Sequence, residues 1–333
     1  MPSALVTGAT GQVGMHVVQR LQRDGWTVQA LVRDRAMAGA LLETGVALVT
    51  GNVLNAASFA SAARGCDVVF HAAAAVTPSG GWEAYQRPNV EGTRNAIAAV
   101  VQSGSRLVHV SSVAVYGGSA RYLEGSRTSE DAVLSPLSEN SWYARSKRDS
   151  EALVLDAHRE GRIWATAVRP DVIYGRYDRQ FVPRLARLLR RGFAPIIGGG
   201  HSTLAIVHAE NVADGMVRAA ATDAAGGRAY NLANDHDVTA SDFFRLAAEG
   251  LGVRLRRVRV PYAVAKGMER AVFRVTRLLT GKRISGVSFS AVDFLARDNP
   301  FTSERARREL GWNPPVRPEA GVPDAFRWWA ARG

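Results

Sequence analysis

The stretch Ala4-Leu5-Val6-Thr7-Gly8-Ala9-Thr10-Gly11-Gln12-Val13-Gly14 decides the fold of this chain. A short apolar run leads directly into three regularly spaced glycines, and an amphipathic segment follows. This order predicts a strand, a tight turn and a helix. Glycine has no Cβ atom, so the backbone of such a turn can approach a pyrophosphate closely, and the helix N-terminus presents its N–H groups to the phosphates. The stretch therefore indicates a site for a nucleotide cofactor.

The glycine spacing is Gly-x-x-Gly-x-x-Gly, whereas most dinucleotide folds carry Gly-x-Gly-x-x-Gly. A glycine-rich turn without any ligand therefore stays open as an alternative on this stretch alone. Other residues of the chain are needed to distinguish a cofactor site from a turn without a ligand.

Composition places the chain among globular proteins with ample material for a core. Of the 333 residues, 47% are hydrophobic and 22% are charged. No apolar run approaches the roughly 20 residues of a membrane span. Cys66 is the only cysteine, which excludes an intrachain disulfide, and no His, Asp or Glu cluster has metal-ligand spacing, so we expect no metal. The N-terminus enters the first strand without a leader-like segment, which favours a cytoplasmic setting.

The net charge of +12 is high. It could reflect a nucleic acid, an anionic membrane or an anionic ligand, or only an arginine-rich solvated surface. Nucleic-acid binding would need clustered basic residues with interleaved aromatics. The charge is dispersed apart from one segment near residue 270, so we expect no nucleic-acid partner.

Strand-like and helix-like patterns alternate over the first half of the chain. This alternation predicts an α/β fold with a doubly wound parallel sheet of the Rossmann type, in which ligands bind at the carboxyl ends of the strands. The expected strands cover residues 3–7, 27–32, 46–50, 67–71, 106–111 and 163–168, and the expected helices 12–23, 35–43, 56–63, 88–103 and 141–160.

Beyond residue 175 the pattern becomes less regular. We expect a dinucleotide-binding domain over residues 1–175 and, mainly within 176–333, a smaller C-terminal α/β lobe that binds the substrate. Some later segments should return to the first domain, and the two parts should share an interface. The later strands are expected near residues 203–207, 229–232 and 254–260, and the helices near 179–191, 210–221, 240–250 and 262–280.

Tyr143 and Lys147 stand four residues apart in the helix expected over 141–160, a spacing that puts both side chains on one face. An ammonium beside a phenol stabilises the phenolate, so that a tyrosine can exchange a proton with a carbonyl or alcohol oxygen near neutral pH. Ser112 follows an expected strand, where its hydroxyl could bind the same oxygen or cap a turn. An ordinary exposed helix face and a capping serine stay open on these residues alone.

Taken together and in this order, the motifs of the chain resemble the extended short-chain dehydrogenase/reductase family. The resemblance runs over nearly the whole chain. Around residue 170 it is nearest to 3β-hydroxysteroid dehydrogenase-like and dihydroflavonol reductase-like members. The motifs that carry it are residues 7–14 (TGATGQVG), 70–74 (FHAAA), 89–93 (NVEGT), 112–117 (SVAVYG), 143–147 (YARSK), 168–175 (VRPDVIYG), 207–213 (VHAENVA) and 309–314 (ELGWNP).

The resemblance implies a hydride-transferring enzyme in which Tyr143 is the general acid/base. It implies that Lys147 lowers the pKa of that tyrosine and binds the nicotinamide ribose, and that Ser112 orients the reacting oxygen. Asn89 would support the central helix and the proton path. The implied cofactor-binding residues are Gly8, Thr10, Gly11, Gln12, Val13, Arg33, Asn52, Val53, Ala72, Ala73, Ala74, Asn89, Tyr143, Lys147, Pro170 and Val172.

The end of the second expected strand bears on the form of the cofactor. Family members that prefer NAD usually carry an acid where this chain has Val32, and Arg33 follows. An arginine can pair with a 2′-phosphate, so NADP(H) is expected, with NAD(H) still possible because Asp34 could reach the ribose. Asn52-Val53 resembles the family's adenine-contacting pair, with Asn in place of the acid.

Asp171 stands where nucleotide-sugar enzymes of the family usually carry an Asn, and the dehydratase acid pair is missing after Ser112. We therefore expect a ketone/alcohol oxidoreductase acting on an apolar small molecule. A nucleotide-sugar epimerase or dehydratase is the first alternative. A non-catalytic NADP-binding regulator is the second, although such proteins typically lose the Tyr/Lys pair. The sequence reveals neither the substrate nor the direction or stereochemistry of the reaction.

The segment 262–283 combines an apolar helical stripe with basic residues. Such a helix can touch an anionic membrane or guard a lipophilic pocket, and an ordinary lobe helix with a solvated basic face stays open beside these. A homodimer is also expected, because the helices at 88–103 and 141–160 pair with their copies in many family members. Here those helices carry apolar residues such as Val101 and Leu155.

Overall fold

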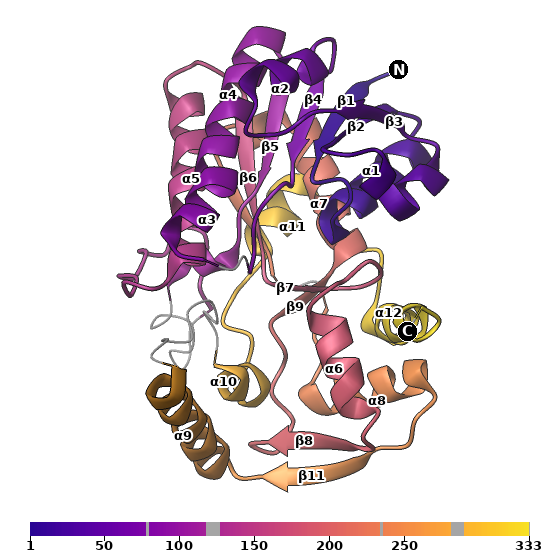
Figure 1. Cartoon of the computed structure of the whole chain (residues 1–333), viewed down its shortest axis with the longest axis vertical. Helices are drawn as coiled ribbons and strands as arrows, with labels where there is room; N and C mark the ends of the chain where they lie inside the picture. Colours follow the sequence, from indigo (N-terminus) through magenta and orange to yellow (C-terminus); the bar gives the residue numbers. More distant parts are fainter. Residues whose placement is uncertain (78–79, 118–126, 234–235, 281–289, 333) are drawn as a thin grey trace.

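The computed structural model describes residues 1–77, 80–117, 127–233, 236–280 and 290–332 (Figure 1). Its centre is a seven-stranded sheet in the order β10-β6-β5-β4-β1-β2-β3, with every neighbouring pair parallel. This is the doubly wound α/β sheet that the sequence predicts. The strands are β1 (Ser3–Thr7), β2 (Thr27–Val32), β3 (Ala47–Thr50), β4 (Val68–His71), β5 (Arg106–Val110), β6 (Ala165–Pro170) and β10 (Ala229–Leu232).

Alternation along each strand divides the core into two layers. In β1, Ala4 and Val6 pack with the layer that contains α1 and α7, whereas Leu5 packs with the opposite layer. Successive strand side chains point to opposite faces, so a strand buried on both sides must be apolar throughout. The first layer holds α1 (Gln12–Arg23), α7 (Ala209–Ala221) and α11 (Glu304–Leu310), and the second holds α2 (Ala56–Ala63), α4 (Gly92–Ser103) and α5 (Trp142–Arg159).

The segments after residue 175 divide between this sheet and a second core. The strand β10 and the helices α7 and α11 join the sheet, while the remaining elements surround a separate apolar cluster below it (Figure 1). The strand β7 (Val172–Tyr174) links the two parts by pairing in parallel with β9 (Ile206–His208). The other elements of the lower part are α6 (Phe181–Leu189), β8 (Phe193–Ile197), α8 (Ala240–Leu251), β11 (Arg256–Val260), α9 (Tyr262–Thr280), α10 (Ala291–Ala296) and α12 (Pro318–Ala330).

Several elements differ from the sequence-based expectation. The segment expected as a helix over 35–43 is a 3₁₀ helix, Ala36–Thr44, kinked at Gly39, whose φ is 51°. The helix expected from residue 88 begins earlier, with α3 (Trp82–Gln86), and passes through a π-helical turn, Arg87–Glu91. The strand expected near 203–207 is shorter and later, as β9. The sequence patterns did not predict the short strands β7 and β8 or the helices α10, α11 and α12.

The basic segment expected over 262–283 forms α9 as far as Thr280. Its last residues, 281–283, lie outside the described residues. Within the described part of the chain, no helix is both long enough and apolar enough to cross a bilayer.

Gly14 offers a test of the turn that opens the fold. A Cβ atom there would lie 2.3 Å from the Gly8 carbonyl oxygen and 2.7 Å from Ala9 Cα, both backbone atoms. Gly14→Ala should therefore lower the free energy of unfolding by about 1–3 kcal/mol. The matched control is Gly267→Ala in α9, where nothing lies within 4 Å of the new atom. That change should stabilise the helix by about 0.5–1 kcal/mol. Urea unfolding checks both variants, and equal effects would contradict the packing argument.

Candidate functional site

The turn between β1 and α1 forms a cradle with no room for side chains. Gly8 has φ +67°, and a Cβ atom on it would lie 2.6 Å from the Ala73 amide nitrogen. Gly11 precedes the first residue of α1, and no side chain caps its helix. The first turn of α1 therefore presents backbone N–H groups to any anion lying between it and the loop that follows β4.

Two polar atoms at this edge of the sheet support a ligand site. Gln12 Nε2 and Ser111 Oγ are buried, and neither has a hydrogen-bond partner in the described structure. Buried polar groups are nearly always paired, so an orphaned donor beside a phosphate-sized cradle fits a bound polar molecule. The residues present therefore fit a nicotinamide dinucleotide.

Beneath the cradle, His71 joins three elements by hydrogen bonds. Its Nδ1 lies 2.8 Å from Thr7 Oγ1 and its Nε2 lies 3.2 Å from Thr93 Oγ1. Thr7 Oγ1 also accepts from the Ala73 amide at 3.3 Å. Burial, followed by the charge of Lys147, lowers the pKa of His71 to about 3. The ring is therefore neutral and fixes the loop after β4 against the first strand.

Asn89 lies in the π-helical turn Arg87–Glu91 and holds the same loop from the other side. Its Oδ1 accepts from the Ala75 amide at 2.7 Å, and its Nδ2 donates to the Ala75 carbonyl at 2.9 Å and to Ser146 Oγ at 2.9 Å. Ser146 in turn donates to the Tyr143 carbonyl oxygen at 2.8 Å. The widened helical turn thus lets one amide connect the cofactor-side loop to the start of α5.

Lys147 carries the buried charge of the site. Its side chain lies on α5, and its Nζ donates to the carbonyl oxygen of Val110, the last residue of β5, at 2.8 Å. Burial lowers the pKa of Lys147 to about 8, and the nearby Glu151 carboxylate opposes that shift. Val110 lies two residues before Ser112 in the chain, so this bond places the ammonium near the strand end that carries Ser112.

Ser112 and Tyr143 complete the group. Ser112 Oγ accepts from the Ala114 amide at 3.1 Å and caps a short 3₁₀ helix. A hydroxyl that accepts one bond still has its own proton to donate. Tyr143 lies in the first turn of α5, half-buried, with its ring centroid 6.4 Å from that of Tyr85. The structure thus brings together at one sheet edge the strand end that carries Ser112 and the helix that carries Tyr143 and Lys147.

Behind this group lies a buried network that the sequence analysis missed. Glu151, one helical turn after Lys147, pairs with Arg169 of β6 through two bonds of 2.6 and 2.9 Å. Arg169 also donates to Tyr116 Oη at 2.7 Å, and Tyr116 donates to Asn231 Oδ1 at 2.8 Å. The feature of the sequence that pointed to this network is the four-residue spacing of Lys147 and Glu151, which puts both side chains on one face of the helix.

The residues expected to read the adenosine half lie at the far end of the same edge. Arg33 is exposed directly after β2. The carboxylate of Asp34 accepts from the Ala36 amide at 2.9 Å, and the Asn52 side chain accepts from the Leu54 amide at 3.0 Å. Asp34 and Asn52 thus each accept a bond within their own turns, and Arg33 is the exposed cation that directly follows this strand.

The other expected site residues border the same edge. The Thr10 carbonyl accepts from Arg179 at 3.2 Å, and the Val53 carbonyl accepts from Asn95 of α4 at 2.8 Å. Val13 packs against the core layer of α1. Pro170 ends β6, Val172 begins β7, and the loop residues Ala72 and Ala74 flank Ala73.

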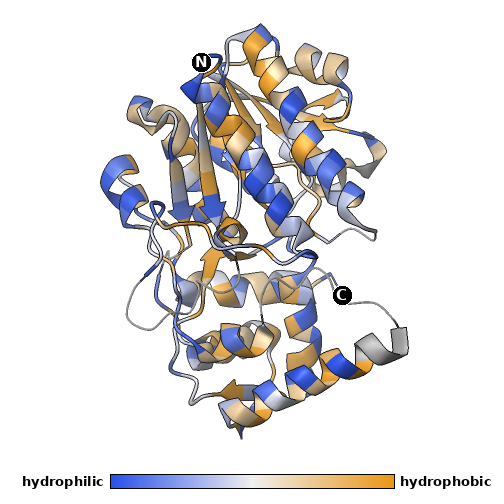
Figure 2. Cartoon of the chain, turned by 90° about the vertical axis from the view of Figure 1, so that its left-hand side faces the viewer, coloured by the Kyte–Doolittle hydropathy of each residue, from blue (hydrophilic) through white to orange (hydrophobic). Residues whose placement is uncertain are grey.

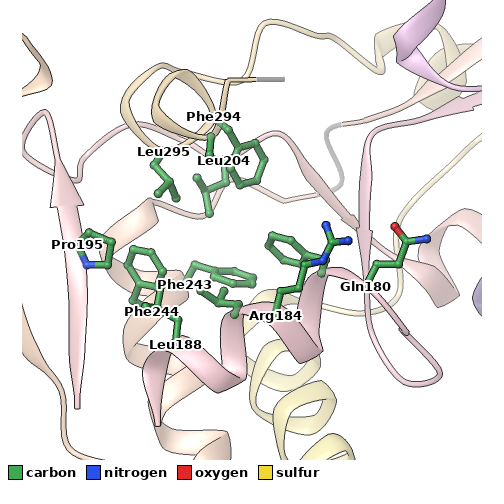
Figure 3. Close-up of a pocket in the computed structure, with 12 residues that line it drawn as sticks. Gln180, Arg184, Leu188, Pro195, Leu204, Phe243, Phe244, Phe294 and Leu295 are labelled. Carbon is green, nitrogen blue, oxygen red and sulfur yellow. The ribbon is translucent and has the colours of Figure 1, made fainter. Parts of the chain in front are cut away.

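An apolar cavity of about 350 Å³ opens in the lower part, between α6, β8, α8 and α10 (Figure 3). Its lining contains one guanidinium, from Arg184, and within the described residues no carboxylate. Sequence patterns could not reveal it, because its walls come from four separated elements. The lining residues are Gln180, Phe181, Arg184, Leu185, Leu188, Pro195, Leu204, Phe243, Phe244, Ala291, Phe294 and Leu295.

Comparison with known proteins gives a family and several relatives. The model of the NAD dependent epimerase/dehydratase family matches residues 4–233. A 4-hydroxy-2-methyl-3-oxo-4-farnesyl-3,4-dihydroquinoline-1-oxide ketoreductase of Stigmatella aurantiaca is 30% identical over 97% of this chain and 95% of its own. A 2-alkyl-3-oxoalkanoate reductase of Shewanella oneidensis is 30% identical over 96% of this chain and 84% of its own.

Solved structures agree with this assignment of the fold. The crystal structure of gox2253 has a TM-score of 0.78 at 26% identity and covers 100% of this chain and 99% of its own. MoeE5 in complex with UDP-glucose and NAD has a TM-score of 0.73 at 26% identity, with 99% of both chains covered.

The buried ammonium of Lys147 makes stability depend on pH in a defined direction. Its pKa in the folded chain is about 8, below the ordinary value of 10.5. Between these values the unfolded chain holds more protons, so the free energy of unfolding rises with pH. Lys147→Met removes this contribution. The unfolding free energy of wild type minus that of the variant should therefore increase by about 2–3 kcal/mol between about pH 7.5 and 10. Urea unfolding without cofactor measures it, and a difference that does not change with pH would contradict the assigned pKa.

Proposed function

The chain belongs to the NAD dependent epimerase/dehydratase family, and we propose that it is an NADP(H)-dependent oxidoreductase that interconverts a ketone and a secondary alcohol on an apolar, aromatic or lipid-like substrate. One observation carries the proposal. The bond from Lys147 Nζ to the Val110 carbonyl holds a buried ammonium between the helix of Tyr143 and the strand end of Ser112. This arrangement supports proton exchange between Tyr143 and a carbonyl oxygen.

When bound, a nicotinamide cofactor supplies or accepts the hydride. The residues of the chain handle the proton and the oxygen. In the direction of reduction, Tyr143 Oη gives its proton to the carbonyl oxygen, while the Ser112 hydroxyl donates a hydrogen bond to that oxygen and fixes its position. The Lys147 ammonium stabilises the phenolate that remains on Tyr143.

The apolar cavity supports the substrate class. Helix α6, which provides Phe181 and Leu185 to its wall, begins a few residues after β7 at the carboxyl edge of the sheet. An acyl or ring group can transfer its CH₂ groups there from water at a gain of about 0.8 kcal/mol each. The ketoreductase and the oxoalkanoate reductase among the relatives act, by their names, on molecules with farnesyl or alkyl groups. Arg184 at the cavity would suit a carboxylate or another anionic group on such a molecule.

The nucleotide-sugar alternative has one observation in its favour, the similarity to MoeE5, which binds UDP-glucose and NAD. The contacts near the sheet edge weigh against it. Arg176 pairs with Asp324 through bonds of 2.7 and 2.6 Å, and Arg179 donates to the Thr10 carbonyl. Asp171 stands where nucleotide-sugar enzymes of the family usually carry an Asn, and a carboxylate there would repel a diphosphate. Of the arginines that follow the sixth strand, Arg184 therefore has the best access to a ligand.

Two further expectations stay proposals. We propose that residues 1–175 bind the cofactor while the lower core selects the substrate. We also propose a homodimer through α4 and α5, because Val101 on α4 is half exposed while Ile97 and Val100 beside it are buried.

Tyr143→Phe tests the chemistry. Hydrophobic ketones screened with NADPH by nicotinamide absorbance should identify a substrate, and the variant should then lose about 10²–10⁴-fold in rate while cofactor affinity stays within about threefold of wild type. The matched control is Tyr85→Phe, whose ring is the neighbour of Tyr143 and which should keep the wild-type rate. Wild-type turnover by Tyr143→Phe would refute the mechanism. Thermal stabilisation by UDP or dTDP with none from ketones, under saturating NADP⁺, would favour the nucleotide-sugar alternative.

Arg33→Ala tests the cofactor form. Removing a charge-assisted contact to the 2′-phosphate should weaken NADP(H) binding about ten- to a hundred-fold and spare NAD(H). Arg35→Ala is the matched control, since Arg35 is also exposed but donates to the Leu48 carbonyl at 3.0 Å. Calorimetry that shows equal losses for both cofactors would overturn the assignment of Arg33.

A further inference from the structure

The lower end of the molecule has an exposed face in which apolar and cationic side chains lie next to each other. We call it the α9/β11 face. On α9, Val264 is 51%, Met268 63% and Val272 61% exposed, although each is apolar. Figure 2 shows α9 along the lower edge of the molecule, with hydrophobic and hydrophilic segments alternating along its length. The described members of the face are Arg256 and Val258 of β11 and Val264, Met268, Arg270, Ala271, Val272, Arg274 and Val275 of α9.

The inner side of α9 is occupied by contacts with α10. Lys266 Nζ donates to Asp293 Oδ2 at 2.7 Å and to Glu269 Oε2 at 2.9 Å, and Glu269 accepts from Ser290 Oγ at 2.7 Å. Apolar residues at a spacing of three and four form one continuous stripe on a helix. The stripe from Val264 to Val275 therefore lies beside this inner side, and the arginines of α9 border it toward the solvent.

The face lies in a strongly basic segment. Residues 251–275 contain seven cationic side chains and one carboxylate, a net charge of +6 out of +12 for the whole chain. The single carboxylate, Glu269, is already paired with Lys266. On β11, which leads into α9, Arg256 is exposed on the same side as Val260, which packs with Ala265 of α9, whereas the exposed Arg257 and Arg259 point to the other side. The described face thus presents unneutralised positive charge around an apolar stripe.

We propose that the α9/β11 face docks onto the surface of an anionic lipid membrane. A helix with an apolar stripe and a basic border lies in the interface, where its apolar side enters the acyl boundary and its cations meet lipid phosphates. A second copy of this chain fits the charge poorly, because a symmetric contact would bring together two faces whose described members each include three arginines and no carboxylate. Nucleic acid fits the side chains poorly, because the residues between the arginines are mainly aliphatic, such as Val258 and Met268.

Docking would place the substrate cavity close to the lipid. Helix α10 provides Phe294 and Leu295 to the cavity wall. The preceding residue of the same helix, Asp293, accepts a hydrogen bond from Lys266 of α9. The docking helix and one wall of the cavity are therefore tied together by a partly buried ion pair. An apolar substrate dissolved in the membrane would have a short path to the cavity.

Flotation of the full chain with lipid vesicles tests the electrostatic half of the proposal. The chain should bind vesicles that contain about 30% phosphatidylglycerol and not vesicles of phosphatidylcholine alone, and binding should fall as salt rises. Arg270→Gln with Arg274→Gln should lower the partition coefficient about 20–30-fold, at about fivefold for each arginine. The matched control is Arg64→Gln with Arg94→Gln, two exposed arginines at the C-cap of α2 and on α4, which should bind like wild type.

The apolar half needs separate variants. Met268→Asp with Val272→Asp should abolish binding, whereas Val133→Asp, at a loop residue that is 90% exposed, should not. In a Cys66→Ser background, Met268→Cys carrying an environment-sensitive fluorophore should shift to the blue only with anionic vesicles, and Arg94→Cys should not shift. These measurements use neither substrate nor cofactor, so their outcome is independent of the proposed reaction.

Three results would overturn the proposal. The first is an absence of binding to anionic vesicles, and the second is equal binding to both vesicle types. The third is a doubled mass in light scattering that the Met268→Asp with Val272→Asp variant abolishes while vesicle binding persists, which would assign the face to a second copy. Circular dichroism of each variant verifies that the exposed substitutions leave the fold intact.

Discussion

The structure around the site depends on the Lys147 ammonium, because a charge buried in the core needs a hydrogen-bond acceptor and a counter-charge. Its hydrogen-bond acceptor is the backbone of β5, and its nearest counter-charge is Glu151 on the same helix. Glu151 is itself held by Arg169 of β6, in a pair whose side chains are 6% and 7% exposed. Removing either partner of such a pair leaves a charge stranded in the interior, so the site depends on β6 as much as on α5.

The same network reaches into the second half of the chain. Arg169 donates to Tyr116 Oη, and Tyr116 donates to the side-chain oxygen Oδ1 of Asn231 in β10. The backbone N–H of Asn231 donates to Glu130 Oε1 at 2.8 Å. Burial raises the pKa of Tyr116 to about 12, so this phenol remains a neutral donor. The strand β10 therefore does more than extend the sheet. Its Asn231 accepts the bond from Tyr116, in a chain of hydrogen bonds that runs from Glu151 to Glu130.

His71 and His109 lie near the Lys147 ammonium and must stay uncharged for the same reason. The rings of His71 and His109 stack at 5.6 Å, and His109 Nε2 lies 3.2 Å from Ser150 Oγ. Burial, and then the Lys147 charge, lower the pKa of each ring. A protonated imidazole here would add a second uncompensated cation to the layer. These histidines are therefore neutral hydrogen-bonding groups of the core, and the reaction proposed above assigns the proton exchange to the more exposed Tyr143.

The parts of this arrangement that sequence predicts are those that local rules determine. Apolar runs and glycines predicted the first six strands, and Ser112, Tyr143 and Lys147 could be singled out because each stands at a strand end or at a fixed helical spacing. The partners of Arg169 and the apolar cavity could not be predicted, because tertiary packing joins them from separate elements; Glu151 lies 18 positions and Tyr116 lies 53 positions from Arg169. The π-helical turn at Asn89 was not predicted for a related reason. The Asn89 side chain bonds there to Ala75 and Ser146, which are distant in the sequence. The proposed chemistry therefore depends on residues in local motifs, whereas the proposed substrate cavity is formed by packing among α6, α8 and α10, which carry no such motif.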